Sequence, residues 1–298
     1  QAYYDIFDEK FIQYFNDNGN LPVTVNGRLT PGTYKLPGDV SSQFVSGLLF
    51  ALPMLNADSV IEITSPLESS AYVDMTINCL AKFGIQIENE GGMHRRYLVK
   101  GKQHYQAQDS QVEGDWSQAA FWTVGGSLGT SITCEGVNVN SLQGDQAVVG
   151  IMERMGAAIK QDANSITVNG GATKATMIDA ANCPDIIPVL TVLAAVSEGT
   201  TKIINAGRLR IKECDRLAAM TSELNKMGAS ITEEPEGLTI VGKPEGLKGG
   251  VKVDAWNDHR IAMSLAIAAQ KCAEPIILSG AESVAKSDAI YHFLLLDS

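Results

Sequence analysis

Stretches of mainly apolar residues recur along the chain at a regular spacing, and an aspartate precedes each of them. These aspartates are separated by 76, 70 and 73 residues and are Asp39, Asp115, Asp185 and Asp258. A second pattern, a bulky apolar residue followed by glycine, recurs at steps of 72 residues and gives Gly84, Gly156 and Gly228, with a weaker copy ending at Gly19. Two independent patterns, the aspartates and the glycines, recur with nearly the same period, which indicates an internal repeat.

Each repeat predicts the same series of elements. The stretch after the aspartate is apolar on nearly all faces, so we expect a buried helix that the aspartate caps. β-Branched segments such as 59–64 and 200–204 predict a strand. A second helix follows and ends at the glycine, which suits a left-handed position. Two alternating strands close the unit, as in 230–241. The unit is therefore βαβαββ, about 72 residues long, and the fold class is α/β.

The repeat begins out of phase with the chain. Residues 1–36 supply a helix, predicted over 7–18, and two strands, which correspond to the end of a unit whose first half is absent. We therefore expect the chain to be a piece of a longer repeat protein.

Composition and charge narrow the class of protein. The chain has 298 residues, 45% of them hydrophobic, and a mean hydropathy of +0.01, which excludes disordered and collagen-like proteins and suggests two domains. A net charge of −11 with no run of lysine or arginine argues against nucleic acid or an anionic membrane as partner. No apolar run approaches the roughly 20 residues of a membrane span.

Cysteine and histidine usage argues against a metal site. The five cysteines are far apart and include no Cys-x-x-Cys pair, and the four histidines have no paired-ligand spacing. We therefore expect free thiols in a reducing compartment and no metal.

The densest charged segment is 208–216, which holds four cations and two acids between a predicted strand and a predicted helix. One interpretation is a solvated helix start with weak ion pairs. The other is a phosphate or carboxylate site at the carboxyl end of a strand. Cys214 lies within this segment, where a nearby cation could lower the thiol pKa, but we favour a packing role for it.

Helix starts supply the other candidates. Residues 257–260 open the fourth buried helix, either as a plain cap by Asp258 or as an anion site in which Arg260 adds to the helix dipole. The three polar side chains of 41–43 exceed what capping requires and suggest a phosphate cradle. A purely structural role is also open for each remaining candidate. Asp185 could be only a helix cap, Ser69 and Tyr72 could belong to a turn, and Lys286 could be a surface residue.

Four segments together closely resemble the EPSP synthase (3-phosphoshikimate 1-carboxyvinyltransferase) family. They are Leu36-Pro-Gly-Asp-Val-Ser-Ser-Gln-Phe44, Ser65-Pro-Leu-Glu-Ser69 with Tyr72-Val-Asp-Met-Thr76, Arg210-Ile-Lys-Glu-Cys-Asp-Arg216 and Asn257-Asp-His-Arg-Ile-Ala-Met263. The resemblance covers essentially the whole chain. It implies a two-domain inverse α/β prism, in which each domain is a pseudo-threefold of the unit with helices inside and sheets outside.

The resemblance also implies a reaction. This family transfers the enolpyruvyl group of phosphoenolpyruvate to the 5-hydroxyl of shikimate 3-phosphate, in the shikimate pathway of aromatic amino-acid biosynthesis. It uses no metal or organic cofactor. The resemblance further implies a monomeric, cytoplasmic transferase whose partners are these two small molecules.

Site roles follow by resemblance, residue by residue. Asp185 matches the family's proton acceptor and Glu213 its proton donor. The residues that match the shikimate 3-phosphate site are Ser41, Ser42, Gln43, Ser69, Tyr72, Asp185 and Lys212. Those that match the phosphoenolpyruvate site are Gln43, Arg216, His259, Arg260 and Lys286. Arg208 falls where some members have an asparagine that contacts the shikimate phosphate, so its role stays open.

The sequence departs from the family by an absence. The family's N-terminal Lys-Ser…Arg segment, its Gly-rich loop and its Arg-Pro motif do not occur here. We therefore expect a partial lower domain over 1–112, with one and a half units, and a nearly complete second domain over 113–298 that lacks its first strand. The chain alone is expected to have almost no turnover.

Two other functions stay open at this point. The sister family, UDP-N-acetylglucosamine enolpyruvyl transferase, shares the repeat but not the Ser-Ser-Gln and Lys-Glu-x-Asp-Arg pair. A non-catalytic module of the same fold would not need the whole set of acids and cations.

Overall fold

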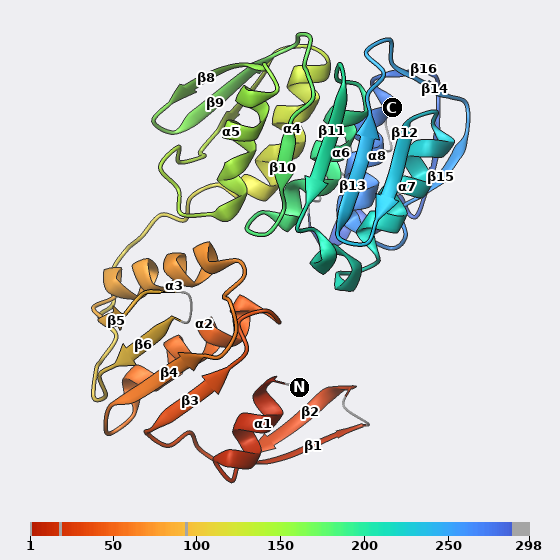
Figure 1. Cartoon of the computed structure of the whole chain (residues 1–298). Coiled ribbons are helices and arrows are strands. Elements are labelled where there is room, and N and C mark those ends of the chain that lie inside the picture. Colours follow the sequence, from red (N-terminus) through yellow and green to blue (C-terminus); the bar gives the residue numbers. More distant parts are fainter. Residues whose placement is uncertain (1, 18–19, 93–94, 288–298) are drawn as a thin grey trace. The chain divides into compact units, whose positions relative to one another are not determined.

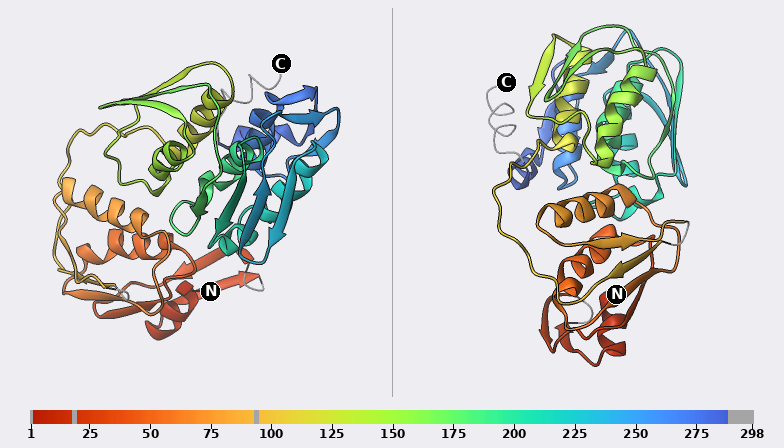
Figure 2. Two further views of the ribbon diagram at one scale, coloured as in Figure 1. Left: turned by 45° about the horizontal axis from the view of Figure 1, so that its top comes forward. Right: turned by 90° about the vertical axis from the view of Figure 1, so that its left-hand side faces the viewer.

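The computed structural model describes residues 2–17, 20–92 and 95–287, and it divides the chain into two compact units, 1–111 and 112–298. Both units combine helices with sheets, as Figures 1 and 2 show. We describe each unit by itself. Among the described residues, no helix is long and apolar enough to cross a membrane.

Unit 1 is built on the four-stranded sheet β3–β4–β6–β5, in which β3 and β4 are parallel and the other pairs antiparallel. Helices α2 and α3 pack on this sheet through a shared apolar core. The elements in chain order are α1 (Ala2–Glu9), β1 (Gln13–Asp17), β2 (Asn20–Asn26), β3 (Thr33–Leu36), α2 (Ser42–Ala51), η1 (Leu52–Met54), β4 (Ser59–Ile63), α3 (Ser70–Lys82), β5 (Ile87–Asn89) and β6 (Arg96–Val99).

The helix predicted over 7–18 is wrong. Helix α1 ends at Glu9, and residues 13–17 instead form β1, which pairs antiparallel with β2. The sequence between these strands contains Asn18-Gly19, the dipeptide that most favours a two-residue hairpin turn. The repeat pattern instead predicts a helix end at Gly19, and this prediction conflicts with the hairpin signal of the same dipeptide.

Unit 2 contains the four-stranded sheet β10–β11–β13–β12, the three-stranded sheet β7–β9–β8, and the parallel pairs β14–β16 and β15–β17. Its first half comprises α4 (Trp116–Leu128), β7 (Ile132–Glu135), η2 (Gly144–Gln146), α5 (Ala147–Arg154), β8 (Ala158–Asp162), β9 (Ser165–Asn169), β10 (Met177–Asp179) and η3 (Pro184–Ile186). Its second half comprises α6 (Ile187–Ala195), β11 (Thr200–Ile204), η4 (Gly207–Ile211), α7 (Arg216–Lys226), β12 (Ser230–Glu234), β13 (Gly237–Val241), β14 (Leu247–Gly249), β15 (Lys252–Asp254), α8 (His259–Ala269), β16 (Cys272–Glu274), β17 (Ile277–Ser279) and η5 (Ala281–Lys286).

Three helices form the interior of unit 2. Each of α4, α6 and α8 contacts the other two, and every residue of α6 is buried. The sheets lie on the outside, with β10–β11–β13–β12 in front of α6 and α8 in Figure 1. The prediction that the recurring apolar stretches are buried helices is therefore confirmed in unit 2. Complete burial of a leucine-sized side chain contributes about 1.5–3 kcal/mol, so each large apolar side chain of these helices stabilises the unit.

The recurring glycines end three helices in the same way, as predicted. Gly84, Gly156 and Gly228 have φ values of +83°, +88° and +100°. At each one the glycine N–H and the N–H that follows it bond back to carbonyls of the last helical turn. This is the Schellman arrangement, in which glycine avoids the steric cost of a left-handed residue.

Gly156→Ala should lower the free energy of unfolding of unit 2 by about 1 kcal/mol, because an L-residue resists φ > 0. A Cβ atom at this position meets no atom within 4 Å, so backbone strain is the whole effect. All three tryptophans lie in unit 2, so their fluorescence during urea unfolding reports on this unit alone. Gly171→Ala is the matched control: its Cβ is also uncrowded and its φ lies outside the left-handed region, so no loss is expected there. Equal losses at both glycines would contradict the argument.

The predicted aspartate caps form at two helices. The carboxylates of Asp115 and Asp258 each accept a hydrogen bond of 2.8 Å from the main-chain N–H two residues on, at the starts of α4 and α8. At α2 the prediction is wrong: the cap is Ser41, and Asp39 instead accepts a hydrogen bond from Ser65 Oγ.

The predicted cap at Asp185 is also wrong. This residue lies in η3, and no side chain caps α6. The N–H two residues after Asp185, which corresponds to the donors at Asp115 and Asp258, belongs to Ile187 and bonds instead to the main-chain oxygen of Pro184. The carboxylate of Asp185 is therefore left for other contacts.

Candidate active site

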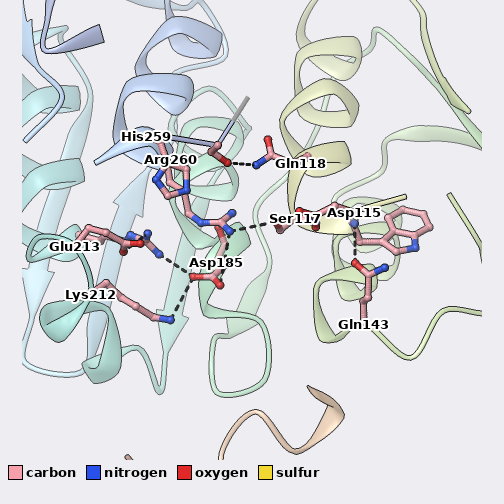
Figure 3. A network of polar contacts seen from close by, with 12 residues as sticks. Asp115, Ser117, Gln118, Gln143, Asp185, Lys212, Glu213, His259 and Arg260 are labelled. Atoms are coloured by element: carbon pink, nitrogen blue, oxygen red, sulfur yellow. Dashed lines mark hydrogen bonds and ion pairs between the residues drawn. The ribbon is translucent and has the colours of Figure 1, made fainter. Parts of the chain in front are cut away.

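The starts of α4, α6 and α8 meet the segment 207–215 within unit 2, and polar side chains from all four gather there (Figure 3). The three helix starts occupy equivalent positions in successive repeats. The repeat itself therefore brings together residues that are more than 140 positions apart in sequence, such as Ser117 and Arg260.

Arg216, the first residue of α7, is the centre of this cluster. Its side chain is only 1% exposed, and its three guanidinium nitrogens each bind a carboxylate. Nη1 donates to Asp185 Oδ1 at 2.8 Å, Nε to Asp258 Oδ2 at 2.7 Å, and Nη2 to Glu213 Oε2 at 2.7 Å. Such charge-assisted bonds fix the geometry of all three acids.

Asp185 faces three cations. Besides Arg216, Lys212 Nζ lies 3.4 Å from Oδ1 and Arg260 Nη2 lies 3.7 Å from Oδ2. Burial by itself would raise the pKa of this carboxyl group, but the three cations outweigh it and lower the pKa to about 2. Asp185 is therefore ionised at neutral pH.

Arg260 sits in the first turn of α8 and is held by the neighbouring repeats. Its Nη1 donates to the main-chain oxygen of Asp185 at 3.2 Å, and its Nη2 donates to Ser117 Oγ at 3.1 Å. A guanidinium at a helix start adds to the positive end of the helix dipole. The arrangement suits an anionic ligand.

His259 precedes Arg260, and Figure 3 shows the two side chains at the start of α8. Burial lowers the pKa of the imidazole, and Arg260 and Arg216 lower it further, whereas the nearby Asp258 opposes this. The neutral imidazole is thus favoured at neutral pH, so the ring can donate or accept a hydrogen bond without carrying a charge.

Glu213 is the most accessible acid of the cluster, with a side chain that is 50% exposed. It follows Lys212 on the segment between η4 and α7, and its carboxylate binds Arg216. This accessible carboxyl group lies beside Asp185, which is half as exposed and has a low pKa, so the cluster holds two acids in different surroundings, as separate acid and base roles require.

Cys214 does not carry a lowered thiol pKa. Burial raises the pKa to about 12, and Asp258 adds to the rise because its Oδ2 lies 3.6 Å from the sulfur, while Arg216 opposes it. A thiol pKa lowered by a nearby cation is therefore contradicted, and Cys214 packs against the apolar core of unit 2, the role we favoured from the sequence. The five cysteines are free, and no group of the described residues could hold a metal ion.

A second polar group lies in unit 1, at the ends of two parallel strands. Residues 41–43 start α2 after β3, and Ser69 and Tyr72 lie at the start of α3 after β4. Because β3 and β4 are parallel, both helix starts lie at one edge of the sheet. Ser41 Oγ accepts from the Gln43 N–H at 3.3 Å, and Ser69 has φ +52°.

The structure thus brings Asp185, Lys212, Glu213, Arg216, His259 and Arg260 together in unit 2, and Ser41, Ser42, Gln43, Ser69 and Tyr72 in unit 1. Lys286 ends η5, but its side chain lies outside what the structure describes.

Sequence reasoning missed the contacts of Ser117 and of Asp258. Ser117 holds Arg260, and Asp258, which we interpreted only as a cap, also binds Arg216. Alignment of the repeats would have pointed to Ser117, because it lies two residues after Asp115, as Arg260 lies two residues after Asp258.

Comparison with known proteins gives consistent matches. The family model for EPSP synthase (3-phosphoshikimate 1-carboxyvinyltransferase) matches residues 10–291. The 3-phosphoshikimate 1-carboxyvinyltransferase of Clostridium kluyveri is 54% identical over 286 residues, and that of Clostridium acetobutylicum is 52% identical over 287 residues. Each match covers 96% of this chain and 66% of the relative, so the chain spans about two thirds of the length of these relatives.

Solved structures agree with the fold. EPSP synthase from Acinetobacter baumannii matches with a TM-score of 0.82 and 27% identity, over 99% of this chain and 69% of that one. The enolpyruvyl transferase NikO from Streptomyces tendae matches with a TM-score of 0.77 and 19% identity, over 99% of this chain and 71% of that one, which shows the fold alone. The predicted inverse α/β prism architecture is supported by these neighbours.

Proposed function

The chain belongs to the EPSP synthase family, and from this premise we propose that its protein transfers the enolpyruvyl group of phosphoenolpyruvate to the 5-hydroxyl of shikimate 3-phosphate. The products are 5-enolpyruvylshikimate 3-phosphate and phosphate, in the shikimate pathway of aromatic amino-acid biosynthesis. The observation that carries the proposal is the ionised Asp185, enclosed by Lys212, Arg216 and Arg260, with Glu213 bound to the same arginine.

The reaction requires one base and one acid. In the proposal Asp185 accepts the proton of the attacking hydroxyl, and Glu213 protonates the methylene carbon of phosphoenolpyruvate. The new C–O bond gives a tetrahedral intermediate. Loss of phosphate and of a methyl proton from this intermediate restores the double bond, so no oxidant and no cofactor is needed.

The anionic groups of the substrates require cations. We assign phosphoenolpyruvate to Gln43, Arg216, His259, Arg260 and Lys286. We assign shikimate 3-phosphate to Ser41, Ser42, Gln43, Ser69, Tyr72, Asp185 and Lys212. Preorganised cations and helix N–H groups stabilise the charge that develops during such a transfer without reorganising.

Ligand binding should also tune the base. A carboxyl group with a pKa of about 2 is a weak proton acceptor. An anionic substrate that engages Lys212 or Arg260 would share their charge, and the pKa of Asp185 would then rise toward a more basic range. The cations therefore serve both binding and acid–base chemistry in this proposal.

The full product of the gene that encodes this chain, here called the full gene product, tests the proposal. It should release phosphate when phosphoenolpyruvate and shikimate 3-phosphate are both present, and not when UDP-N-acetylglucosamine replaces the shikimate compound. Calorimetry with the 298-residue chain should detect binding of shikimate 3-phosphate but not of the nucleotide sugar. Phosphate release with the nucleotide sugar, or none with either acceptor, would contradict the assignment.

The compartment and assembly belong to the same proposal. The free cysteines suit a reducing cytoplasm, and the acidic chain suits small-molecule partners rather than nucleic acid or membrane. We propose that the protein is a monomer, which light scattering after gel filtration would test.

A further inference from the structure

Arg210 belongs to the same segment, 208–216, as Arg216, but its side chain binds different partners. Its Nε donates to Pro235 O at 3.1 Å and its Nη2 to Glu234 O at 2.7 Å. Its Nη1 donates to Glu233 Oε1 at 2.6 Å and to Asp215 Oδ2 at 3.0 Å. Every nitrogen of the guanidinium is therefore engaged, and three of the four bonds go to the end of the β12–β13 hairpin.

The segment that Arg210 holds has little other support. Leu209 at one end and Arg216 at the other are buried, but Ile211 is 75% exposed, and Lys212 and Glu213 are partly exposed as well. Apolar packing therefore does not fix residues 211–213. Polar bonds must do so: those of Arg210 and of the cap residue Asp215, in addition to the ion pairs of Glu213 with Arg216 and of Lys212 with Asp185.

The hairpin also contacts the start of this segment. The Ala206 N–H donates to Glu236 O at 2.9 Å, and a Cβ atom at Gly207 would collide with the carboxylate of Glu236. The β12–β13 turn thus adjoins the segment closely at 206–207 and is tied to it again through Arg210. The hairpin therefore contacts the segment at two places, 206–207 and Arg210.

We propose that Arg210 is a positioning residue: by tying the segment to the β12–β13 turn, it sets Lys212 and Glu213 at Asp185 and Arg216. The inference rests on the proposed function for its kinetic consequence, but not for the tether itself. Asp215 joins Arg210 to the start of α7, because it accepts from Arg210 through Oδ2 and caps the helix through Oδ1, which accepts from the Ala218 N–H at 3.1 Å.

Arginine is required because the four acceptors are spread around a planar fork. A lysine has its three donors on one atom and cannot reach two carbonyls and two carboxylates at once. Arg210→Lys should therefore keep only part of the exchange protection at 204–219 and of the kcat/KM that Arg210→Gln loses. Arg154→Gln, on α5 of the same unit, is the matched control, because Arg154 bonds only to a carbonyl of its own helix among the hydrogen bonds of the described residues.

Hydrogen exchange tests the tether on the 298-residue chain. In Arg210→Gln, peptides covering 204–219 should exchange roughly tenfold faster, while peptides of β8 and β9 in the same unit keep the wild-type rate. Exchange at 204–219 within twofold of wild type would overturn the proposal. Faster exchange throughout unit 2 would also overturn it, because Arg210 would then be an ordinary stability residue.

Kinetics of the full gene product test the consequence. Arg210→Gln should lower kcat/KM by roughly 10²-fold, because a misplacement of about 1 Å has that effect. Lys212 should also move away from Asp185, leaving Arg216 and Arg260 as its cations, so the pKa of Asp185 rises and the acidic limb of the pH profile shifts to higher pH. In the double variant, Glu233→Gln should lower kcat/KM little further than Arg210→Gln alone, because Glu233 acts through its bond to Arg210.

The outcomes separate the two proposals. An inactive wild type with fast local exchange in Arg210→Gln refutes the proposed function and keeps the tether. An active wild type with unchanged kcat/KM and pH profile in Arg210→Gln refutes the positioning role and keeps the function.

Discussion

Asp185→Asn should reduce the kcat of the full gene product by about 10³-fold, the typical contribution of a positioned general base. Asparagine keeps the size and one acceptor oxygen of the side chain, but it cannot take up a proton. It also removes the negative charge that Lys212, Arg216 and Arg260 share. Because these cations then have one acid fewer, the KM for phosphoenolpyruvate should fall or stay constant while kcat collapses.

This split between kcat and KM separates a base from a binding residue. Steady-state phosphate release measures both constants, and Asp162→Asn, at an exposed position of β8, is the matched control that should keep wild-type kinetics. A rise in KM at constant kcat would assign Asp185 to ligand binding alone. Ligand affinity unaffected by Asp185→Asn, with no turnover in the wild type, would instead indicate a non-catalytic module.

The repeat made much of the fold predictable from the sequence. Glycines at 84, 156 and 228 marked helix ends because their backbone conformation is local and depends on few neighbours. The buried helices were predictable because apolar residues on all faces leave no alternative to burial. The first hairpin was missed because the same Asn-Gly sequence satisfies both a helix end and a turn, and only pairing between β1 and β2 decides.

The site was less predictable because its side chains are oriented by tertiary contacts. Spacing shows that 208–216 holds four cations, but not that Arg216 turns inward to three acids while Arg210 turns outward to the β12–β13 turn. Likewise, Asp185 and Asp258 occupy equivalent repeat positions, yet only Asp258 caps its helix. At Asp185 the corresponding N–H, that of Ile187, bonds instead to the main-chain oxygen of Pro184 in η3.

Arg216→Met should lower the free energy of unfolding of unit 2 by about 3–5 kcal/mol at pH 7, the usual effect of breaking a buried ion pair. The methionine fills most of the volume but leaves Asp258, which is 0% exposed, without its main partner. Urea unfolding followed by tryptophan fluorescence measures the loss in unit 2 alone. Arg154→Met on α5 is the control for an arginine lost from an exposed helix.

The pH dependence of this loss identifies its cause. In the wild type the pKa values of Asp185 and Asp258 are both lowered, that of Asp185 to about 2, so their stabilisation is complete above the unfolded pKa of about 4 and is lost only as pH falls through the lowered values. Without Arg216, burial should raise the pKa of Asp258 above its unfolded value, and the variant regains stability as this group is protonated. The difference between wild type and variant should therefore shrink between pH 7 and pH 4. A constant difference over that range would mean that lost packing, rather than an uncompensated carboxylate, destabilises the variant.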